Sequence, residues 1–336
     1  MKPRKGGMDC FETGAIFSIV GSLAVLLHAA DHLSRLLFAV LLSVTLVMGC
    51  RTVICSPNGT ISPFRPYVAI IMPIYYASWV LVFGFARPLC CIVVALLAIE
   101  AKIGLCMSVC LHRYAAHAAF KCGGLTSLAL GWVGCMANQG GPLWWASKHR
   151  AHHKFCDGPC DPHSALHEGE VLAFMFHGMK KHKAVDEEFV PAHIDSPAAR
   201  WLDALSALPV ITEAALLFWL FGADGLWVSY VSANACQIIT LWFNVENHPP
   251  SGAGDCKATD APSSTRAPGA LFEVLRCTSV FAVFVGESSH SHHHLHPQLA
   301  HRPGPDLPYH LLVRPLAALG LVWDVKASAY QRSHAD

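Results

Sequence analysis

Apolar residues form long uninterrupted runs along this chain, and short polar stretches separate them. A helix needs about 20 apolar residues to cross a bilayer. Four runs approach that length, namely residues 66–84, 88–111, 205–221 and 225–243. Only residues 85–87 join the first two runs, and only the sequence GADG at 222–225 joins the last two. The pattern predicts an all-α integral membrane protein with four core transmembrane helices in two hairpins, whose long flanking segments lie on one side of the membrane.

Two further apolar runs, residues 13–30 and 36–49, precede these hairpins and are separated by the polar sequence DHLSR. They predict either an additional hairpin or a span followed by a helix in the membrane interface, because the second run is short. The acidic residues Asp9 and Glu12, together with the second run, favour a retained anchor over a cleaved signal peptide. We expect an N-terminal hydrophobic anchor over residues 1–65, a main domain over 66–325 and a C-terminal tail over 326–336.

The composition agrees with a membrane location. Hydrophobic residues make up 53% of the 336 residues and charged residues 14%, compared with about a quarter in soluble domains. The net charge is +1, so no broad basic field is present and we expect no nucleic-acid partner. Residues 111–204 contain nine Lys or Arg and the residues after 250 contain seven, whereas the two hairpin turns contain only Arg87. By the positive-inside rule, the long segments face the cytosol.

Three histidine motifs lie at or near the ends of apolar runs: HRYAAH at 112–117, HRAHH at 149–153 and HSHHH at 290–294. Imidazole is a ligand suited to iron, zinc, copper and nickel. One such motif in a polar loop is a weak signal, but three of them at distant points predict a metal centre assembled from separate segments. The other histidines, His163 among them, are expected to be surface or supporting residues.

The spacing within the motifs indicates how the rings converge. On a helix with about 100° per residue, the three histidines of HRAHH share one face, and HSHHH repeats the arrangement. His112 and His117 are about 140° apart on an ideal α-helix, so we expect them to converge because the second span ends or bends there. At the end of the fourth span, Asn244 and His248 share a face and Pro249 stops the helix, which adds a candidate ligand and a hydrogen-bonding amide.

These motifs, quoted with their neighbours as HRYAAH, WWASKHRAHHKFCDGPCDPHS, FNVENH and GESSHSHHH, resemble those of membrane-bound fatty acyl desaturases of the stearoyl-CoA and acyl-lipid delta-9 type. The resemblance covers about residues 66–325. It implies a stem of four spans with a cytosolic helical cap that holds two irons. The family's iron-binding histidines correspond to His112, His117, His149, His152, His153, His248, His290, His293 and His294. Asn244 matches the residue that holds a water molecule on one iron.

The resemblance implies an oxidoreductase that introduces a cis double bond, at the delta-9 position, into a saturated acyl chain with O2. An unactivated methylene has no acidic proton, so removing its hydrogen needs an oxidant made from O2 by a reduced metal pair. Imidazole ligands leave the metals positively charged, and nearby carboxylates should orient the ligands and compensate that charge. The candidate carboxylates are Glu246, Glu287, Asp157 and Asp161. Trp144 and Trp145 are expected to line an apolar tunnel for the acyl chain.

The chain departs from the family pattern at two motifs. Ser291 and His292 stand where the last motif usually has Asn followed by an aromatic residue or Asn, which implies a change in the residues that support the metal ligands. Ser147 and Lys148 replace the Arg-Asp of animal acyl-CoA enzymes, and NQGGP at 138–142 is similar to cyanobacterial and plant members. The acyl carrier, CoA or a glycerolipid, therefore stays open.

Electrons are expected from a separate carrier. The sequence contains neither an HPGG haem motif nor a GxGxxG dinucleotide fingerprint. The resemblance implies cytochrome b5 at an endoplasmic reticulum membrane, the location we favour, or ferredoxin in a plastid or bacterium. A lipid hydroxylase or another monooxygenase with the same metal core is the alternative function. A His-rich metal transporter fits less well, because its ligands should lie in the middle of the spans rather than at their ends.

Overall fold

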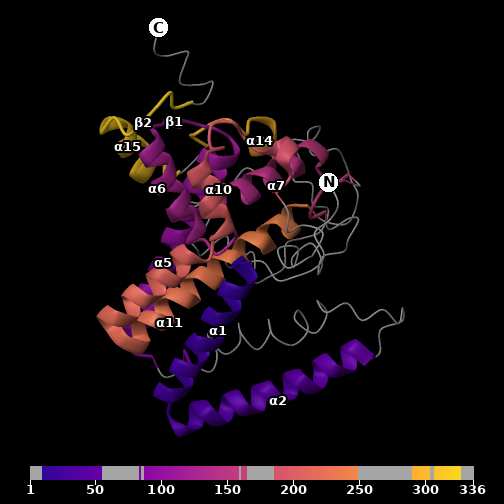
Figure 1. The fold of residues 1–336 in the computed structure, drawn as a ribbon, viewed down its shortest axis with the longest axis vertical. Helices are drawn as coiled ribbons and strands as arrows, with labels where there is room; N and C mark the ends of the chain where they lie inside the picture. Colours follow the sequence, from indigo (N-terminus) through magenta and orange to yellow (C-terminus); the bar gives the residue numbers. More distant parts are fainter. Residues whose placement is uncertain are drawn as a thin grey trace.

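The structure is a computed structural model, and it describes residues 10–54, 83–84, 87–158, 160–164, 185–248, 290–302 and 306–326. Most of the predicted span 66–84 and the candidate residue Glu287 lie outside these residues. The described chain is mostly helical and has one short strand pair (Figure 1). In that pair, β1 (Lys121–Cys122) runs antiparallel to β2 (Val322–Trp323). The predicted all-α character therefore holds for the described chain apart from this pair.

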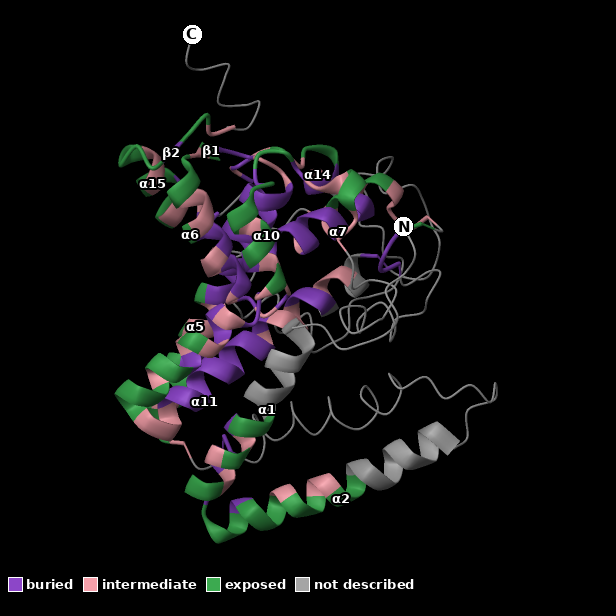
Figure 2. Ribbon diagram, viewed as in Figure 1, coloured by how far each residue is buried: buried purple, intermediate pink, exposed green. Residues whose placement is uncertain are grey.

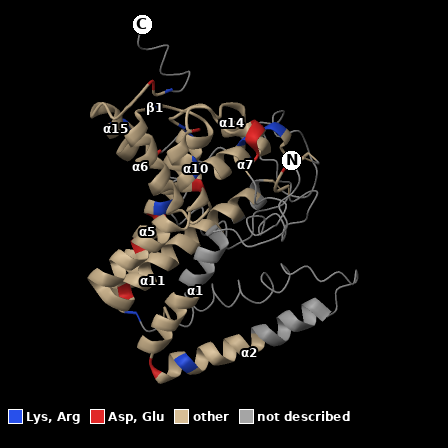
Figure 3. Ribbon diagram, viewed as in Figure 1, with Lys and Arg blue, Asp and Glu red and all other residues tan. Residues whose placement is uncertain are grey.

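Two helical segments, Leu89–Ala116 and Leu208–Leu241, have the length and apolar composition of membrane spans, and the second contains a reversal at Gly222. The first consists of α5 (Leu89–Ala101) and the π-helix η3 (Lys102–Ala116), and the second belongs to α11 (Leu208–Asn247). Charged positions are sparse along α5 and α11 (Figure 3). Large apolar side chains such as Leu97 and Trp219 are exposed on these helices, which fits contact with lipid. The number of spans, predicted as four, stays a prediction.

A glycine interrupts α11 within the predicted turn at 222–225. Gly222 has φ 61° and ψ −143°, which is not helical. A Cβ atom built on Gly225 would lie 2.1 Å from the carbonyl oxygen of Leu217, although eight residues of straight helix span about 12 Å. The chain therefore reverses direction there. Arg87 forms an ion pair with Asp224, so the two predicted turns lie next to each other.

The N-terminal apolar runs form α1 (Cys10–Ala29) and α2 (His32–Ile54). A carboxylate oxygen of Asp31 accepts a hydrogen bond from the backbone N–H of Ser34 at 2.7 Å, which caps the start of α2. The buried Leu26 of α1 belongs to a hydrophobic cluster that includes residues of α11, whereas the described side chains of α2 are mostly exposed (Figure 2). Both runs are therefore helical, and whether both span a membrane stays open.

The remaining elements form a cap at the end of the long helices opposite the turns (Figure 1). They are α6 (Gly124–Cys135), α7 (Pro142–Phe155), η6 (Glu187–Phe189), α10 (Pro197–Ala204), α14 (His290–Leu295), η7 (Tyr309–Val313) and α15 (Arg314–Ala318). Their core, which contains Tyr114, Phe120 and Leu143, packs η3 against α6 and α7. Buried residues concentrate where these elements meet (Figure 2). The cap thus places segments distant in sequence around the end of η3.

Two ion pairs fix this arrangement, one fully buried and one half-buried. Arg113 pairs with Asp306 through two parallel hydrogen bonds, and both side chains are 0% exposed. Lys102 pairs with Glu213 of α11 and also donates a hydrogen bond to the backbone carbonyl of Met136 at 3.2 Å. The first pair therefore ties η3 to the segment that follows α14, and the second ties η3 to α11 and to the end of α6.

Candidate metal centre

The first histidine motif lies at the end of the π-helix η3. In a π-helix each backbone N–H bonds to the carbonyl five residues earlier. The N–H of His117 bonds to the carbonyl of His112 at 3.2 Å, and His117 caps the helix. The predicted helix end is present, but the angle of 140° applies to an α-helix and this segment is a π-helix. Because a π-helix has more residues per turn, residues five apart lie near each other on its surface.

The second and third motifs are helical, as their spacing predicted. HRAHH belongs to α7, and HSHHH forms most of α14. A carboxylate oxygen of Asp203 accepts hydrogen bonds from the backbone N–H groups of Leu143 at 3.0 Å and Trp144 at 2.9 Å, in the first turn of α7. This carboxylate satisfies two donors that a helix start leaves without intrahelical partners.

Five histidines converge on one point, and we call them the five-histidine group: His112, His117, His149, His153 and His293. Their candidate ligand atoms all lie within 4.8 Å of one another. The Nε2 atoms of His112 and His293 are 2.9 Å apart, as are those of His117 and His149. His153 lies 3.0 Å from His149 and 2.9 Å from His293, again between Nε2 atoms.

These separations test whether the group fits a metal ion. Metal–imidazole bonds of about 2.0–2.1 Å at right angles place neighbouring nitrogens about 2.9 Å apart, whereas tetrahedral bonds place them about 3.3 Å apart. The observed distances of 2.9–3.0 Å match the right-angled arrangement. Hydrogen bonds between the rings explain these distances less well. The Nε2 atom of His153 lies close to the Nε2 atoms of both His149 and His293, but a ring nitrogen can donate or accept only one hydrogen bond in the plane of its ring.

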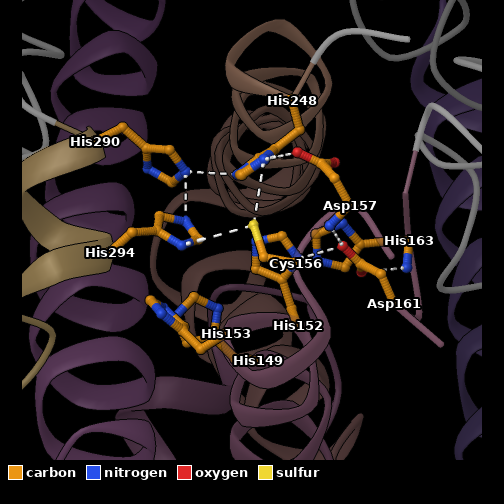
Figure 4. Close-up of polar contacts among 10 residues, drawn as sticks. All are labelled: His149, His152, His153, Cys156, Asp157, Asp161, His163, His248, His290 and His294. Carbon is orange, nitrogen blue, oxygen red and sulfur yellow. Dashed lines mark hydrogen bonds and ion pairs between the residues drawn. The ribbon is translucent and has the colours of Figure 1, made fainter. Parts of the chain in front are cut away.

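The remaining four histidines form a second cluster, the four-histidine group: His152, His248, His290 and His294 (Figure 4). Candidate ligand atoms of His152, His248, His294 and Cys156 lie within 4.8 Å of one another. The Nε2 atom of His290 lies 2.8 Å from that of His248 and 3.0 Å from that of His294. The Nε2 atom of His152 is buried and has no hydrogen-bond partner among the described residues. Such a nitrogen is costly to bury unless a ligand satisfies it.

Asn244 and Cys156 lie beside the four-histidine group. Asn244 is one helical turn before His248 in α11, and its carbonyl accepts the backbone N–H of His248 at 3.0 Å. The sulfur of Cys156 lies 3.7 Å from Nδ1 of His248 and 3.8 Å from Nδ1 of His294 (Figure 4). The end of α11 and the loop after α7 therefore border the same group.

Two carboxylates hold histidines of the four-histidine group. Asp161 accepts a hydrogen bond from Nδ1 of His152 at 2.9 Å, and Asp157 accepts one from Nδ1 of His248 at 3.2 Å (Figure 4). Asp161 is itself fixed by the backbone N–H groups of Asp157 at 2.8 Å and His163 at 3.0 Å. A carboxylate on Nδ1 places the proton there and leaves the Nε2 lone pair for a metal.

His163 is 8% exposed, so of the two expected roles, a surface or a supporting residue, the structure has the second. Its ring stacks on His152 with centroids 4.3 Å apart. Burial and the neighbouring His152 lower the pKa of His163 to about 3. Its place two residues after Asp161 is the signal that sequence reasoning missed, because both belong to the turn that follows α7.

The electrostatics of both groups favour neutral imidazoles. Burial, with repulsion from neighbouring histidines, lowers the pKa of His149 and His153 well below the usual value. Burial also lowers the pKa of His248, although Asp157 opposes the shift. Burial alone would raise the pKa of Asp161, but the contacts with His152 and His163 hold it below the usual value. Neutral imidazole is the form that binds metals.

The two tryptophans play different structural parts. Trp145 stacks on His149 with centroids 4.7 Å apart, and its Nε1–H donates to Oε1 of Gln139 at 3.0 Å. Gln139 in turn donates to the hydroxyl of Thr240 at 2.5 Å. Trp144 packs with residues of the cap and α11. Gln139 is a supporting residue that the sequence reasoning missed. Two of the candidate carboxylates lie outside the part of the chain that the structure describes: the side chain of Glu246 and the whole of Glu287.

Comparisons with known proteins point to lipid-modifying enzymes. The chain is 52% identical over 58 residues to a hex-5-enoyl-[acyl-carrier protein] acetylenase of Moorena producens, covering 17% of this chain and 18% of that protein. It is 34% identical over 115 residues to an acyl-CoA 5-desaturase of Anemone leveillei, covering 33% and 35%. It is 28% identical over 208 residues to an sn-2 palmitoyl-lipid 9-desaturase of Nostoc, covering 59% and 67%.

These matches are partial. For four of the relatives, including the acetylenase and the acyl-CoA 5-desaturase, the chain spans only about one fifth to one third of the relative's length. No protein family model matches the chain.

Proposed function

We propose that this chain, a relative of the fatty acyl desaturases, introduces a double bond into a fatty acyl chain in a reaction that consumes O2. The observation that carries the proposal is the convergence of imidazole nitrogens at separations of 2.8–3.0 Å, the spacing of neighbouring ligands on a metal ion. Relatives named as desaturases of acyl-CoA and acyl-lipid substrates support the same reaction class.

The residues suit a pair of iron ions. The five-histidine group would hold one ion, and the four-histidine group would hold the other with a water molecule on Asn244. Bound iron would supply the oxidant, made from O2 and electrons, that removes hydrogen from a methylene. Asp157 and Asp161 keep Nδ1 of two histidines protonated and orient the rings. Glu246 and Glu287 remain candidates for the same task.

The substrate would bind through its hydrocarbon chain. Burying methylene groups stabilises binding by about 0.8 kcal/mol each, so an apolar tunnel suffices. Trp145, stacked against His149, is well placed to form the wall beside the metals, and Trp144 is the second wall candidate. The shape of that wall would select the carbon that is oxidised, for which we propose the delta-9 position.

The same geometry supports a membrane arrangement that we propose as well. Four spans in two hairpins would place both turns on one side of the bilayer, and the contact between Arg87 and Asp224 supports this. The histidine groups lie at the other end of the long helices, which the distribution of Lys and Arg assigns to the cytosol. We propose the endoplasmic reticulum membrane as the location and a separate one-electron carrier, cytochrome b5 or ferredoxin, as the donor.

Expression in a desaturase-deficient host tests the function. We expect new unsaturated acyl chains in total fatty acids measured by gas chromatography and mass spectrometry, and their loss in His149→Ala. His310→Ala is the matched control, because His310 is an exposed histidine of the cap. Hydroxylated chains in place of unsaturated ones would assign a monooxygenase. Protein without transition metal, or unchanged lipids, would refute the proposal.

A further inference from the structure

The two histidine groups differ in the charges placed around them. In the four-histidine group, His152 and His248 donate hydrogen bonds to Asp161 and Asp157 at 2.9 and 3.2 Å. Asp161 is 5% exposed and accepts further hydrogen bonds from backbone N–H groups, so it stays in place beside its histidine. Negative charge is therefore built into the immediate surroundings of this group.

Three cations lie close in the fold to segments that carry histidines of the five-histidine group. Arg150 donates to the carbonyl of Ala116 at 3.2 Å, and Lys326 donates to the carbonyl of Ala118 at 2.8 Å. These two carbonyls flank His117 in the chain. A third cation, Arg302, is 2% exposed and donates to the carbonyl of His296, three residues after His293, at 3.3 Å.

These charges act differently on a metal ion. A carboxylate hydrogen-bonded to a ligating imidazole makes that imidazole a stronger donor, which favours the more highly charged state of the ion. Cations nearby oppose the same increase in charge. Inside a protein such interactions are screened much less than at the surface. The two metal positions should therefore differ in the ease with which they accept an electron.

We propose that the two irons are reduced in a fixed order, first the ion of the five-histidine group and then that of the four-histidine group. This inference rests on the proposed function. One electron from the external carrier converts Fe(III) to Fe(II) at the five-histidine group, and the carrier is oxidised by one electron. The ion of the four-histidine group stays Fe(III) until a second carrier delivers a second electron. The carboxylates Asp157 and Asp161 and the cation Lys326 set this order as positioning residues.

Stepwise reduction of the full iron-loaded chain in detergent tests the order. Electrons are added from dithionite through a mediator while the potential is recorded, and Mössbauer and electron paramagnetic resonance spectra report the oxidation states. Two separate one-electron steps are expected. Asp161→Asn should make the second step easier and leave the first unchanged, whereas Lys326→Gln should make the first step harder and leave the second unchanged.

Asp195→Asn is the matched control, because Asp195 carries the same charge in an exposed ion pair with Arg200, and it should move neither step. Losing a hydrogen-bonding partner of a metal ligand lowers metal affinity by about 10–100-fold. If Asp161→Asn therefore keeps only one iron, Asp157→Asn replaces it and should shift the second step in the same way.

The outcomes separate the inference from the proposed function. Wild-type protein with fewer than two irons refutes the two-iron proposal itself. A protein that binds two irons and forms unsaturated lipids, but is reduced in a single two-electron step, overturns only the order. The order is also overturned if Asp161→Asn moves the first step or if Lys326→Gln moves the second.

Discussion

Removing one partner of the buried ion pair between Arg113 and Asp306 should strongly destabilise the cap. Two hydrogen bonds of 2.8 and 2.9 Å join the guanidinium to the carboxylate, and neither side chain has exposed surface. Arg113→Met leaves the carboxylate buried without its cation. A buried pair broken in this way costs about 3–5 kcal/mol. Asp306 also accepts the backbone N–H groups of Arg302 and Tyr309, so the segment after α14 should loosen as well.

Thermal unfolding in detergent measures this effect, and the iron content of the purified variant reports on the site. We expect iron to fall, because Arg113 is next to His112 and also donates to the carbonyl of Ala300 at 2.6 Å. The double variant Arg113→Met with Asp306→Asn removes both charges and keeps an oxygen that can accept a backbone N–H. It should therefore recover much of the lost stability, because no uncompensated charge stays buried.

Arg200→Met is the matched control. Arg200 forms ion pairs with Glu187 and Asp195 on the surface, where such pairs contribute about 0–1 kcal/mol. If Arg113→Met destabilises the protein no more than Arg200→Met does, the pair does not hold the cap together. If the double variant is as unstable as the sum of its single variants, charge compensation is not the reason for the loss.

Three further predictions concern stability. Burial raises the pKa of Asp203 from 3.8 to about 6, so the folded protein holds this proton more tightly than the unfolded chain. The resulting stabilisation of about 3 kcal/mol is complete below pH about 4 and lost as the pH rises through about 6, and melting curves of Asp203→Asn should lack this change. Gly141→Ala should unfold at a much lower temperature than wild type, because its Cβ would lie 2.2 Å from a carboxylate oxygen of Asp203, whereas Gly123→Ala, with nothing within 4 Å, should not. Removing iron with a chelator should lower the melting temperature. The free energy of unfolding should fall by about 4 kcal/mol if the free metal had exceeded its dissociation constant a thousandfold, and this loss should be smaller in His152→Ala.

The histidine spacing predicted the local structure of the second and third motifs well. Three histidines on one helical face require only the period of an α-helix, and both α7 and α14 have it. The π-winding around His112 was not predictable from the spacing, because a helix end or a bend would also bring together two histidines that are five residues apart. The contacts of His163 and Gln139 were not predictable either, since they depend on how the turn after α7 and the loop before it fold against other segments.

The division into two groups also requires the tertiary structure. His152 and His153 are neighbours in sequence, yet one belongs to the four-histidine group and the other to the five-histidine group. Both groups draw on α7 and α14, so helical spacing alone does not say which ring faces which centre. The end of α11 decides it, because it brings His248 next to His152 and His290.

The winding of η3 changes how the length of the first motif should be compared between proteins. An α-helical wall would present two rings on the same face at a spacing of four residues, whereas the coil here does so at five. If one residue between His112 and His117 were deleted and this part of η3 became an α-helix, the two rings would stay nearly where they are. A homologue with a shorter first motif can therefore have the same metal site, provided that its backbone N–H groups there bond to the carbonyl four residues earlier instead of five.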